Sequence, residues 1–314
     1  MASTIHPAFE ALSERELPEY RARGLLFRHR ASGCEVYKIA ADDPENCFAF
    51  SFRTPSQDSS GVAHVVEHSV LCGSSRYPAK DPFLVMARRS LATFLNAFTY
   101  PDKTVYPAAS AVKADFFNLM DVYGDAVFFP LLSEETFLQE AHRYEYGGDG
   151  KLDIKGVVYN EMRGDYASAE SLASTYATTS LFGRGHPYSF DSGGDPDEVA
   201  RLSYADFKAF WSGHYSPANC RIALYGDLEL AEELDFLDRR FLSPLSAESG
   251  RAGRPVADVP IQAPAPSPRR VELPCPEGES EGAQVLVSWL LPPAADQGEL
   301  LALELLSELL LGHD

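Results

Sequence analysis

The fold and the chemistry of this chain depend on residues 61–71, which read Gly61-Val62-Ala63-His64-Val65-Val66-Glu67-His68-Ser69-Val70-Leu71. The stretch contains no proline, and apolar residues surround nearly the whole circumference of a helix drawn through it, which predicts a buried helix. Two histidines four residues apart lie on one face of such a helix, and Glu67 projects close to the same place. Burying two imidazoles and a carboxylate is costly unless something compensates their desolvation.

A zinc ion, Zn2+, provides such compensation. Neutral imidazole is a preferred zinc ligand, and a carboxylate beside the ion can take a proton from a bound water. The order of the groups is H-x-x-E-H, the reverse of the H-E-x-x-H motif. The alternative is a pair of ordinary core histidines satisfied by hydrogen bonds, since a short motif can arise by chance in a chain with eight histidines. The apolar helix favours the metal, because unpaired polar groups are costly there.

A catalytic zinc site needs a third protein ligand and leaves its fourth position to water. The downstream candidates are acidic residues: Glu134, Glu135, Glu140, Glu145, Glu161 and Glu170. Spacing alone does not choose among them. Glu161 is favoured because residues 157–159 and Met162 are apolar, so that its carboxylate is expected to be buried and unpaired. The others lie in polar surroundings that a solvated face explains, and Cys72, one turn beyond His68, is a weak candidate.

Composition bounds the class of protein. With 314 residues the chain can form one large or two medium domains, and its 45% hydrophobic and 23% charged residues are typical of a soluble globular protein. The formal net charge of −19 argues against nucleic acid and anionic membrane surfaces as partners and is compatible with basic peptides. No apolar run is long enough to span a bilayer.

The N-terminal residues and the cysteines predict a cytoplasmic protein. Residues 1–16 have neither the apolar core of a signal peptide nor the acid-poor, arginine-rich character of an organelle presequence. The cysteines are odd in number and form no C-x-x-C pair, which favours reduced, mostly buried thiols. They are Cys34, Cys47, Cys72, Cys220 and Cys275.

The chain before residue 243 alternates short strands with helices. We predict strands over residues 25–29, 34–39, 47–52, 93–99, 103–108 and 220–226, from runs of apolar and β-branched residues bounded by turn residues. We predict helices over residues 9–17, 61–71, 83–90, 113–128, 134–144, 154–179, 204–214 and 229–241, from their apolar periodicity.

Composition changes after residue 242. Residues 243–268 are rich in proline, alanine, serine and glycine and are expected to form a linker. Strands are predicted over residues 270–273 and 284–290, and a helix encircled by leucines over residues 299–311. We therefore divide the chain into a zinc peptidase domain (1–242), a linker (243–268) and the truncated start of a second, similar domain (269–314), which is too small to bury its apolar faces alone.

Four segments together resemble the presequence proteases, which belong to the pitrilysin–insulinase clan of inverted-motif zinc peptidases. They are residues 64–74, 93–104, 155–162 and 191–196, which occur in the same order over roughly residues 25–240. The resemblance implies an α+β fold, in which an antiparallel-rich sheet is flanked by helices. It also implies that such domains are repeated and that two halves close around a chamber.

The resemblance further implies the roles of individual residues. His64, His68 and Glu161 are expected to bind zinc, and Glu67 is expected to act as the general base. An edge strand is expected to bind a peptide by strand addition through four consecutive residues: Leu95, Asn96, Ala97 and Phe98. For Asn96 a turn or cap role is the alternative.

These features predict a zinc-dependent endopeptidase that degrades short unstructured peptides, with this chain as its N-terminal catalytic portion. The alternative is a non-catalytic or partner-dependent binding or assembly subunit of the same clan. The intact His64, Glu67, His68 and Glu161 set argues against that alternative, while the short chain argues for it. A C-terminal half or a partner chain is expected to complete the chamber and to supply an arginine and a tyrosine, roles that no residue here can be assigned.

Overall fold

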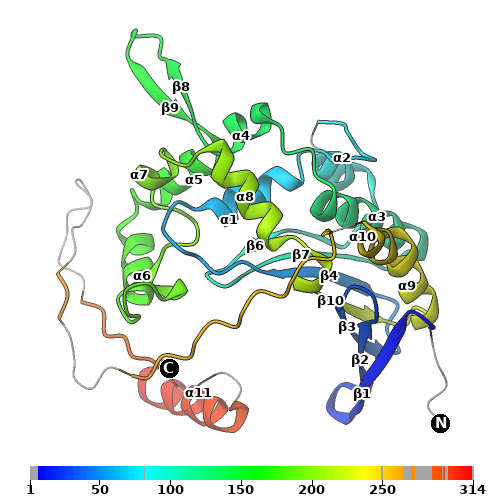
Figure 1. Ribbon diagram of the computed structural model, residues 1–314. Coiled ribbons are helices and arrows are strands. Elements are labelled where there is room, and N and C mark those ends of the chain that lie inside the picture. Colours follow the sequence, from blue (N-terminus) through cyan, green and yellow to red (C-terminus); the bar gives the residue numbers. More distant parts are fainter. Residues whose placement is uncertain are drawn as a thin grey trace.

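The main body of the protein is an eight-stranded sheet with helices packed on it (Figure 1). The computed structural model describes residues 6–80, 82–248, 250–264, 270–272, 285–291, 293 and 296–312. Strands and helices alternate along the chain, and most strand pairs are antiparallel. The predicted α+β fold with an antiparallel-rich sheet is therefore confirmed.

A strand from late in the sequence lies in the middle of the sheet. Its strands are β1 (Phe9–Leu17), β2 (Ala22–His29), β3 (Glu35–Ala41), β4 (Asn46–Arg53), β5 (Phe94–Leu95), β6 (Phe98–Thr99), β7 (Lys103–Ser110) and β10 (Cys220–Gly226). They pair in the order β1-β2-β3-β10-β4-β7-β5, and β6 also pairs with β7. Among the strands described, β10 and β3 form the one parallel pair. Because β10 lies between β3 and β4, residues 220–226 hold the two halves of the sheet together.

Twelve helices of α or π type occur within the described residues. They are α1 (Val62–Val70), α2 (Pro82–Arg89), α3 (Lys113–Phe128), α4 (Glu134–Glu140), α5 (Val157–Asp165), α6 (Ala169–Thr179), α7 (Pro196–Val199), α8 (Tyr204–His214), α9 (Leu230–Leu237), η4 (Asp238–Leu242), α10 (Ser243–Ala247) and α11 (Gln297–Leu311). Short 3-10 turns are η1 (Pro18–Tyr20), η2 (Pro187–Ser189) and η3 (Pro217–Asn219).

The core lies between the sheet and the helices on one of its faces. Alternate residues of β4 point into it, and Phe48, Phe50 and Phe52 are almost completely buried. The Phe48 ring meets Phe116 of α3 edge-on, and Phe50 meets Phe128 at the other end of that helix. Each buried aromatic side chain contributes roughly 2–3 kcal/mol through apolar burial. This core fixes α3 on the sheet and leaves α1 beside it, next to β6.

Three predicted helices were wrong at least in part. Residues 9–17 form β1, because their backbone pairs with β2 along its length. The helix predicted over residues 134–144 ends at Glu140, and the one predicted over residues 154–179 begins only at Val157 and is interrupted once, between α5 and α6. Between Glu140 and Val157 lies the hairpin of β8 (Arg143–Tyr146) and β9 (Leu152–Lys155), which Figure 1 shows projecting from the body. A Cβ on Gly156 would lie 2.1 Å from the Ala141 carbonyl oxygen, so the junction of β9 and α5 needs glycine.

The first part of the segment after residue 242 packs on the main body. The first residues of the expected linker form α10, and Leu245 is buried in the core. Further on, the Arg53 side chain donates to the Val256 carbonyl (2.9 Å), and the Val256 amide donates to Asn219 Oδ1 (3.0 Å). The domain boundaries themselves stay a prediction.

The elements expected beyond the linker are only partly present. The helix predicted over residues 299–311 is confirmed as α11, whose leucines are mostly exposed. The strands predicted over residues 270–273 and 284–290 are not seen in described residues 270–272 and 285–290, which have no neighbouring strand to pair with; Leu273 and Gln284 lie outside the described residues. In the described part of the chain, no helix has the length and apolar character needed to cross a membrane.

Candidate metal centre

Helix α1 is anchored at its first turn by a close approach of two backbones. Gly61, which precedes the helix, has a φ of 64°, and a Cβ there would lie 2.5 Å from the Gly193 carbonyl oxygen. Glycine is therefore required at residue 61 for both reasons. The approach brings the Gly193 carbonyl to His64, whose Nδ1 lies 3.0 Å from it.

The three predicted metal ligands converge on one point. Nε2 of His64 and Nε2 of His68 each lie 3.8 Å from Oε2 of Glu161 on α5. The ligand atoms of the three residues all lie within 4.8 Å of one another, and no other group of this kind occurs among the described residues. In a tetrahedral zinc site, bonds of about 2.0–2.2 Å place ligand atoms roughly 3.3–3.6 Å apart. The observed spacing reaches this with a small inward movement of the side chains.

Both histidines are oriented by contacts at the nitrogen that faces away from Glu161. His64 Nδ1 donates to the Gly193 carbonyl, and His68 Nδ1 donates to Oε2 of Glu140 at 3.3 Å. Because these acceptors carry no proton, the ring proton belongs on Nδ1 and the lone pair on Nε2. Two imidazole lone pairs and a carboxylate oxygen around one point are a donor set that suits zinc. The residues present therefore fit the metal that the sequence motif predicts.

The reason given for choosing Glu161 from the sequence was wrong. Its side chain is 50% exposed, whereas Val158 and Met162 on the same helix are buried. Helix α5 buries its apolar side and holds Glu161 at the open side of the centre. The carboxylate is thus aimed at the two histidines without being buried.

Glu140 is the residue that sequence reasoning missed. It was expected to lie on a solvated face, yet it is only 4% exposed and contacts His68. Gln139 Nε2 (2.8 Å) and Cys72 Sγ (3.6 Å) also lie within hydrogen-bonding distance of its Oε1. The available signal was the helical spacing of Phe137, Glu140 and Ala141, which places the carboxylate on the same inward face as two buried apolar residues.

The ionisation of this pair follows from its contacts. Burial lowers the pKa of His68, but its hydrogen bond to Glu140 and the nearby carboxylates outweigh burial, so that the pKa is raised. Burial raises the pKa of Glu140, but the hydrogen bonds from His68 and Gln139 outweigh it, so that the pKa is lowered. In the metal-free protein, both shifts favour a negatively charged Glu140 beside a protonated His68.

The predicted general base lies between the metal ligands and the sheet edge. Glu67 is 8% exposed, and the Thr99 hydroxyl donates to its Oε2 at 2.5 Å. Thr99 belongs to β6, so the strand at the edge of the sheet fixes the orientation of the carboxylate. This contact leaves the other carboxylate oxygen to act on a substrate or a water.

The predicted substrate-binding residues lie on this edge in one continuous register. Phe94 pairs with Ala109 and Phe98 with Val105, both on β7. The pairing is interrupted between them because Pro107, opposite Asn96, has no N–H to donate. The Asn96 carbonyl instead accepts a hydrogen bond from the Tyr123 hydroxyl at 3.3 Å.

The outward-facing donor of the edge is covered by a neighbouring side chain. The Asn96 amide donates to the Pro107 carbonyl, so the next amide, that of Ala97, points away from β7. Asn96 Oδ1 accepts from this amide at 2.9 Å. Asn96 therefore protects the edge in the absence of a partner strand, a role different from the turn or cap considered from the sequence.

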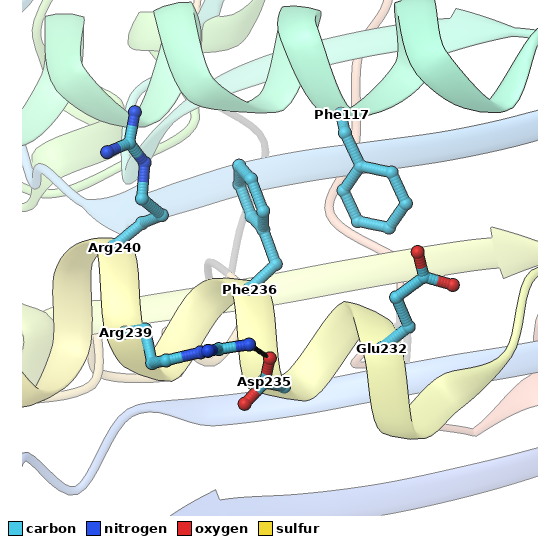
Figure 2. Close-up of a pocket in the computed structure, with 6 residues that line it drawn as sticks. All are labelled: Phe117, Glu232, Asp235, Phe236, Arg239 and Arg240. Atoms are coloured by element: carbon cyan, nitrogen blue, oxygen red, sulfur yellow. Dashed lines mark hydrogen bonds and ion pairs between the residues drawn. The ribbon is translucent and has the colours of Figure 1, made fainter.

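A concave region away from the metal centre lies between α3 on one side and α9 and η4 on the other. Figure 2 shows its lining residues, Phe117, Glu232, Asp235, Phe236, Arg239 and Arg240. The Arg239 guanidinium is paired with Asp235, and that of Arg240 with Asp121. Since both arginines are engaged, this region holds no uncompensated charge that would attract a ligand.

Comparison with known proteins identifies the class. The profile of the family described as "Insulinase (Peptidase family M16)" matches residues 53–149, and that described as "Peptidase M16 inactive domain" matches residues 201–314. The crystal structure of pitrilysin superposes with a TM-score of 0.60 over 82% of this chain and 26% of that chain, at 18% identity, which supports the fold. The chain belongs to the insulinase (M16) family of peptidases.

Within that family the chain is similar to presequence proteases. It is 44% identical over 243 residues to "Presequence protease 1, chloroplastic/mitochondrial" of Arabidopsis thaliana, covering 75% of this chain and 22% of the relative. It is 38% identical over 305 residues to "Presequence protease, mitochondrial" of Danio rerio, covering 94% of this chain and 29% of the relative. The chain thus spans between a fifth and a third of the length of these curated relatives.

Proposed function

We propose that this chain carries the catalytic centre of a zinc-dependent endopeptidase that degrades short unstructured peptides. The observation that carries the proposal is the convergence of His64 Nε2, His68 Nε2 and Glu161 Oε2 on one point, with Glu67 beside it. Membership of a peptidase family supports the reaction class. His64, His68 and Glu161 would hold the metal, which when bound supplies Lewis-acid polarisation of the scissile carbonyl and of a water.

Glu67 provides the proton transfer in this proposal. Its carboxylate accepts the proton of the water that attacks the peptide carbonyl and later delivers a proton to the leaving amine. The Thr99 hydroxyl holds one carboxylate oxygen, so that the other is presented to the water in a fixed direction. Proton transfer of this kind requires a positioned group within hydrogen-bonding reach, and the buried location of Glu67 keeps competing bulk water away.

The sheet edge provides the substrate-binding surface. We propose that an extended peptide pairs with residues 95–98, so that a peptide carbonyl replaces Asn96 Oδ1 as the acceptor of the Ala97 amide. Because Thr99 continues this strand and contacts Glu67, a peptide in this register lies beside the base. The net charge of −19 favours basic peptides. Most backbone groups of a folded protein are already paired, which favours an unstructured substrate.

The partner and the location are proposals of the same kind. A C-terminal half or partner chain is expected to complete the site and to donate to the oxyanion of the intermediate. The loss of one oxyanion donor costs about a hundredfold or more in rate. The cytoplasmic location stays a prediction, and the printed names of the presequence proteases include mitochondria and chloroplasts.

Substitution of Glu67 by glutamine tests the function. Glu67→Gln keeps the shape and leaves the ligands intact, so zinc content should be unchanged while kcat on an unstructured basic peptide falls about 10²–10⁴-fold. The matched control is Glu135→Gln, which removes an exposed carboxylate from α4. If the 314-residue chain alone turns over peptide too slowly to assay, a longer form of the protein that continues past residue 314 is used. Near-normal turnover by Glu67→Gln contradicts the role of the base. Zinc binding without hydrolysis by any form would favour the non-catalytic subunit.

A further inference from the structure

The two histidines of the centre are held by different kinds of group. His64 donates to a backbone carbonyl in the loop that packs on the start of α1, whereas His68 donates to the side chain of Glu140, 72 residues further along the chain. The side chain of His68 is also the more exposed of the two, at 25% against 11%. An imidazole at an open site turns easily about its last torsion, which has broad energy minima. Of the two histidines, His68 therefore has the greater need of a fixed partner.

Glu140 is built to be such a partner. Its carboxylate is buried, and Gln139 and Cys72 contact one oxygen while His68 contacts the other. No lysine or arginine of the described residues pairs with it, so its charge is satisfied mainly at His68. Its helix, α4, is fixed by the Ser133 cap, which accepts from the Thr136 amide, and by buried Phe137.

The contact geometry excludes Glu140 as a ligand in its own right. Its carboxylate lies at Nδ1 of His68, on the far side of the ring from Glu161 Oε2, and it is not among the atoms that converge. A carboxylate in this place keeps the ring proton on Nδ1 and directs Nε2 toward the point shared with His64 and Glu161. It would also make Nε2 a stronger metal ligand.

We propose that Glu140 is the positioning residue of the metal centre, which holds His68 in the orientation and tautomer that bind zinc. The inference rests on the proposed function, because it assumes that His64, His68 and Glu161 bind the ion. Removing an outer partner of this kind typically weakens metal binding 10–100-fold. Glu140 should thus affect metal affinity without contacting the metal.

The test measures zinc affinity and does not depend on activity. The Kd for zinc is determined for the 314-residue chain by competition with a chromophoric chelator at fixed pH. Glu140→Gln, which retains the shape but not the charge, should raise the Kd about 10–100-fold. Glu140→Asp, which draws the charge back from Nδ1, should raise it by less. Glu135→Gln on the same helix is the matched control and should leave the Kd unchanged.

A second readout separates positioning from general damage to the fold. Cobalt(II) replaces zinc, and its visible spectrum should shift in Glu140→Gln because one ring has moved. Melting curves of the metal-free variants identify any that are unfolded, and Glu140→Asp then serves in place of Glu140→Gln.

A Kd within twofold of wild type together with an unchanged cobalt spectrum in a folded variant would overturn the inference. His68→Ala keeps this result distinct from the proposed function. If His68→Ala binds zinc as wild type does, the metal centre itself is wrong; if it loses zinc while Glu140→Gln does not, only the role of Glu140 is wrong.

Discussion

Two sets of ionisable groups in this protein are satisfied in opposite ways. Away from the metal centre, Lys38 of β3 and Glu233 of α9 are both completely buried, and the ammonium lies 2.9 and 2.8 Å from the two carboxylate oxygens. At the metal centre, the Nε2 atoms of His64 and His68 and a Glu161 oxygen face one another at 3.8 Å or more. The first pair is closed, whereas the second set surrounds a point.

The difference distinguishes a structural polar group from a functional one. Lys38 and Glu233 use each other as partners and leave no room for a ligand. The histidines use one ring nitrogen for fixed partners and keep the other directed at the shared point. Buried charges that are fully paired stabilise little beyond the cost of burying them. Donors that stay open are available for binding.

The largest expected effect comes from breaking the closed pair. Lys38→Met leaves Glu233 buried without a partner and should lower the free energy of unfolding by about 3–5 kcal/mol. Glu161→Gln, at a half-exposed residue of the centre, should change it by about 0.5 kcal/mol or less in metal-free protein. Urea denaturation with a chelator present measures both. Equal losses in the two variants would remove the distinction.

Replacing both Lys38 and Glu233 tests whether the ion pair itself is needed for stability. Lys38→Met combined with Glu233→Leu should recover most of the stability lost in Lys38→Met, because an apolar pair needs no ion.

The closed pair should also give stability a pH dependence. Burial raises the pKa of Glu233 from 4.5 to about 7, against the opposing attraction of Lys38. A folded-state pKa above the unfolded value means that the folded protein holds the proton more tightly. This contribution is full below about pH 4.5 and is lost as the pH rises to about 7, with a total of about 3 kcal/mol. As the pH rises across this window, the free energy of unfolding should decline more steeply for wild type than for the Lys38→Met/Glu233→Leu variant. Parallel curves for the two would contradict the assignment.

The smallest expected effect concerns the base at the open centre. Thr99→Val removes the hydroxyl that donates to Glu67 and should lower kcat roughly 10–100-fold, since a hydrogen bond to a charged group contributes about 1.5–3 kcal/mol. KM should be unchanged, because the backbone that pairs with the peptide is retained. Thr99→Ser keeps the hydroxyl and is the control that should retain activity. A change in KM alone would place Thr99 in substrate binding.

The open centre could be predicted from sequence where its parts are local. His64, Glu67 and His68 lie within five residues of one another, and helical geometry alone puts them together. Glu161 was chosen correctly for convergence but on the premise of burial, which the structure contradicts. Glu140 was passed over because its contact with His68 depends on how α4 packs against α1, and spacing contains no such information.

Prediction of the fold was limited in the same way, by contacts between residues that are distant in the sequence. The strands of residues 25–52 and the helix over residues 113–128 follow from local patterns and are confirmed. Residues 9–17 were predicted to be helical, but pairing with β2, which the local pattern does not reveal, makes them a strand. The place of β10 between β3 and β4 likewise depends on a crossover that spans most of the domain.

Zinc content is the direct test of the metal centre. About one zinc per wild-type chain is expected after dialysis against metal-free buffer, and most of it should be lost in His68→Ala, because two ligands are too few to hold the ion. Lys38→Met/Glu233→Leu, altered in the closed region, should keep wild-type zinc. Metal analysis that finds equal zinc in wild type and His68→Ala would contradict the claim that the open set of side chains is a metal centre.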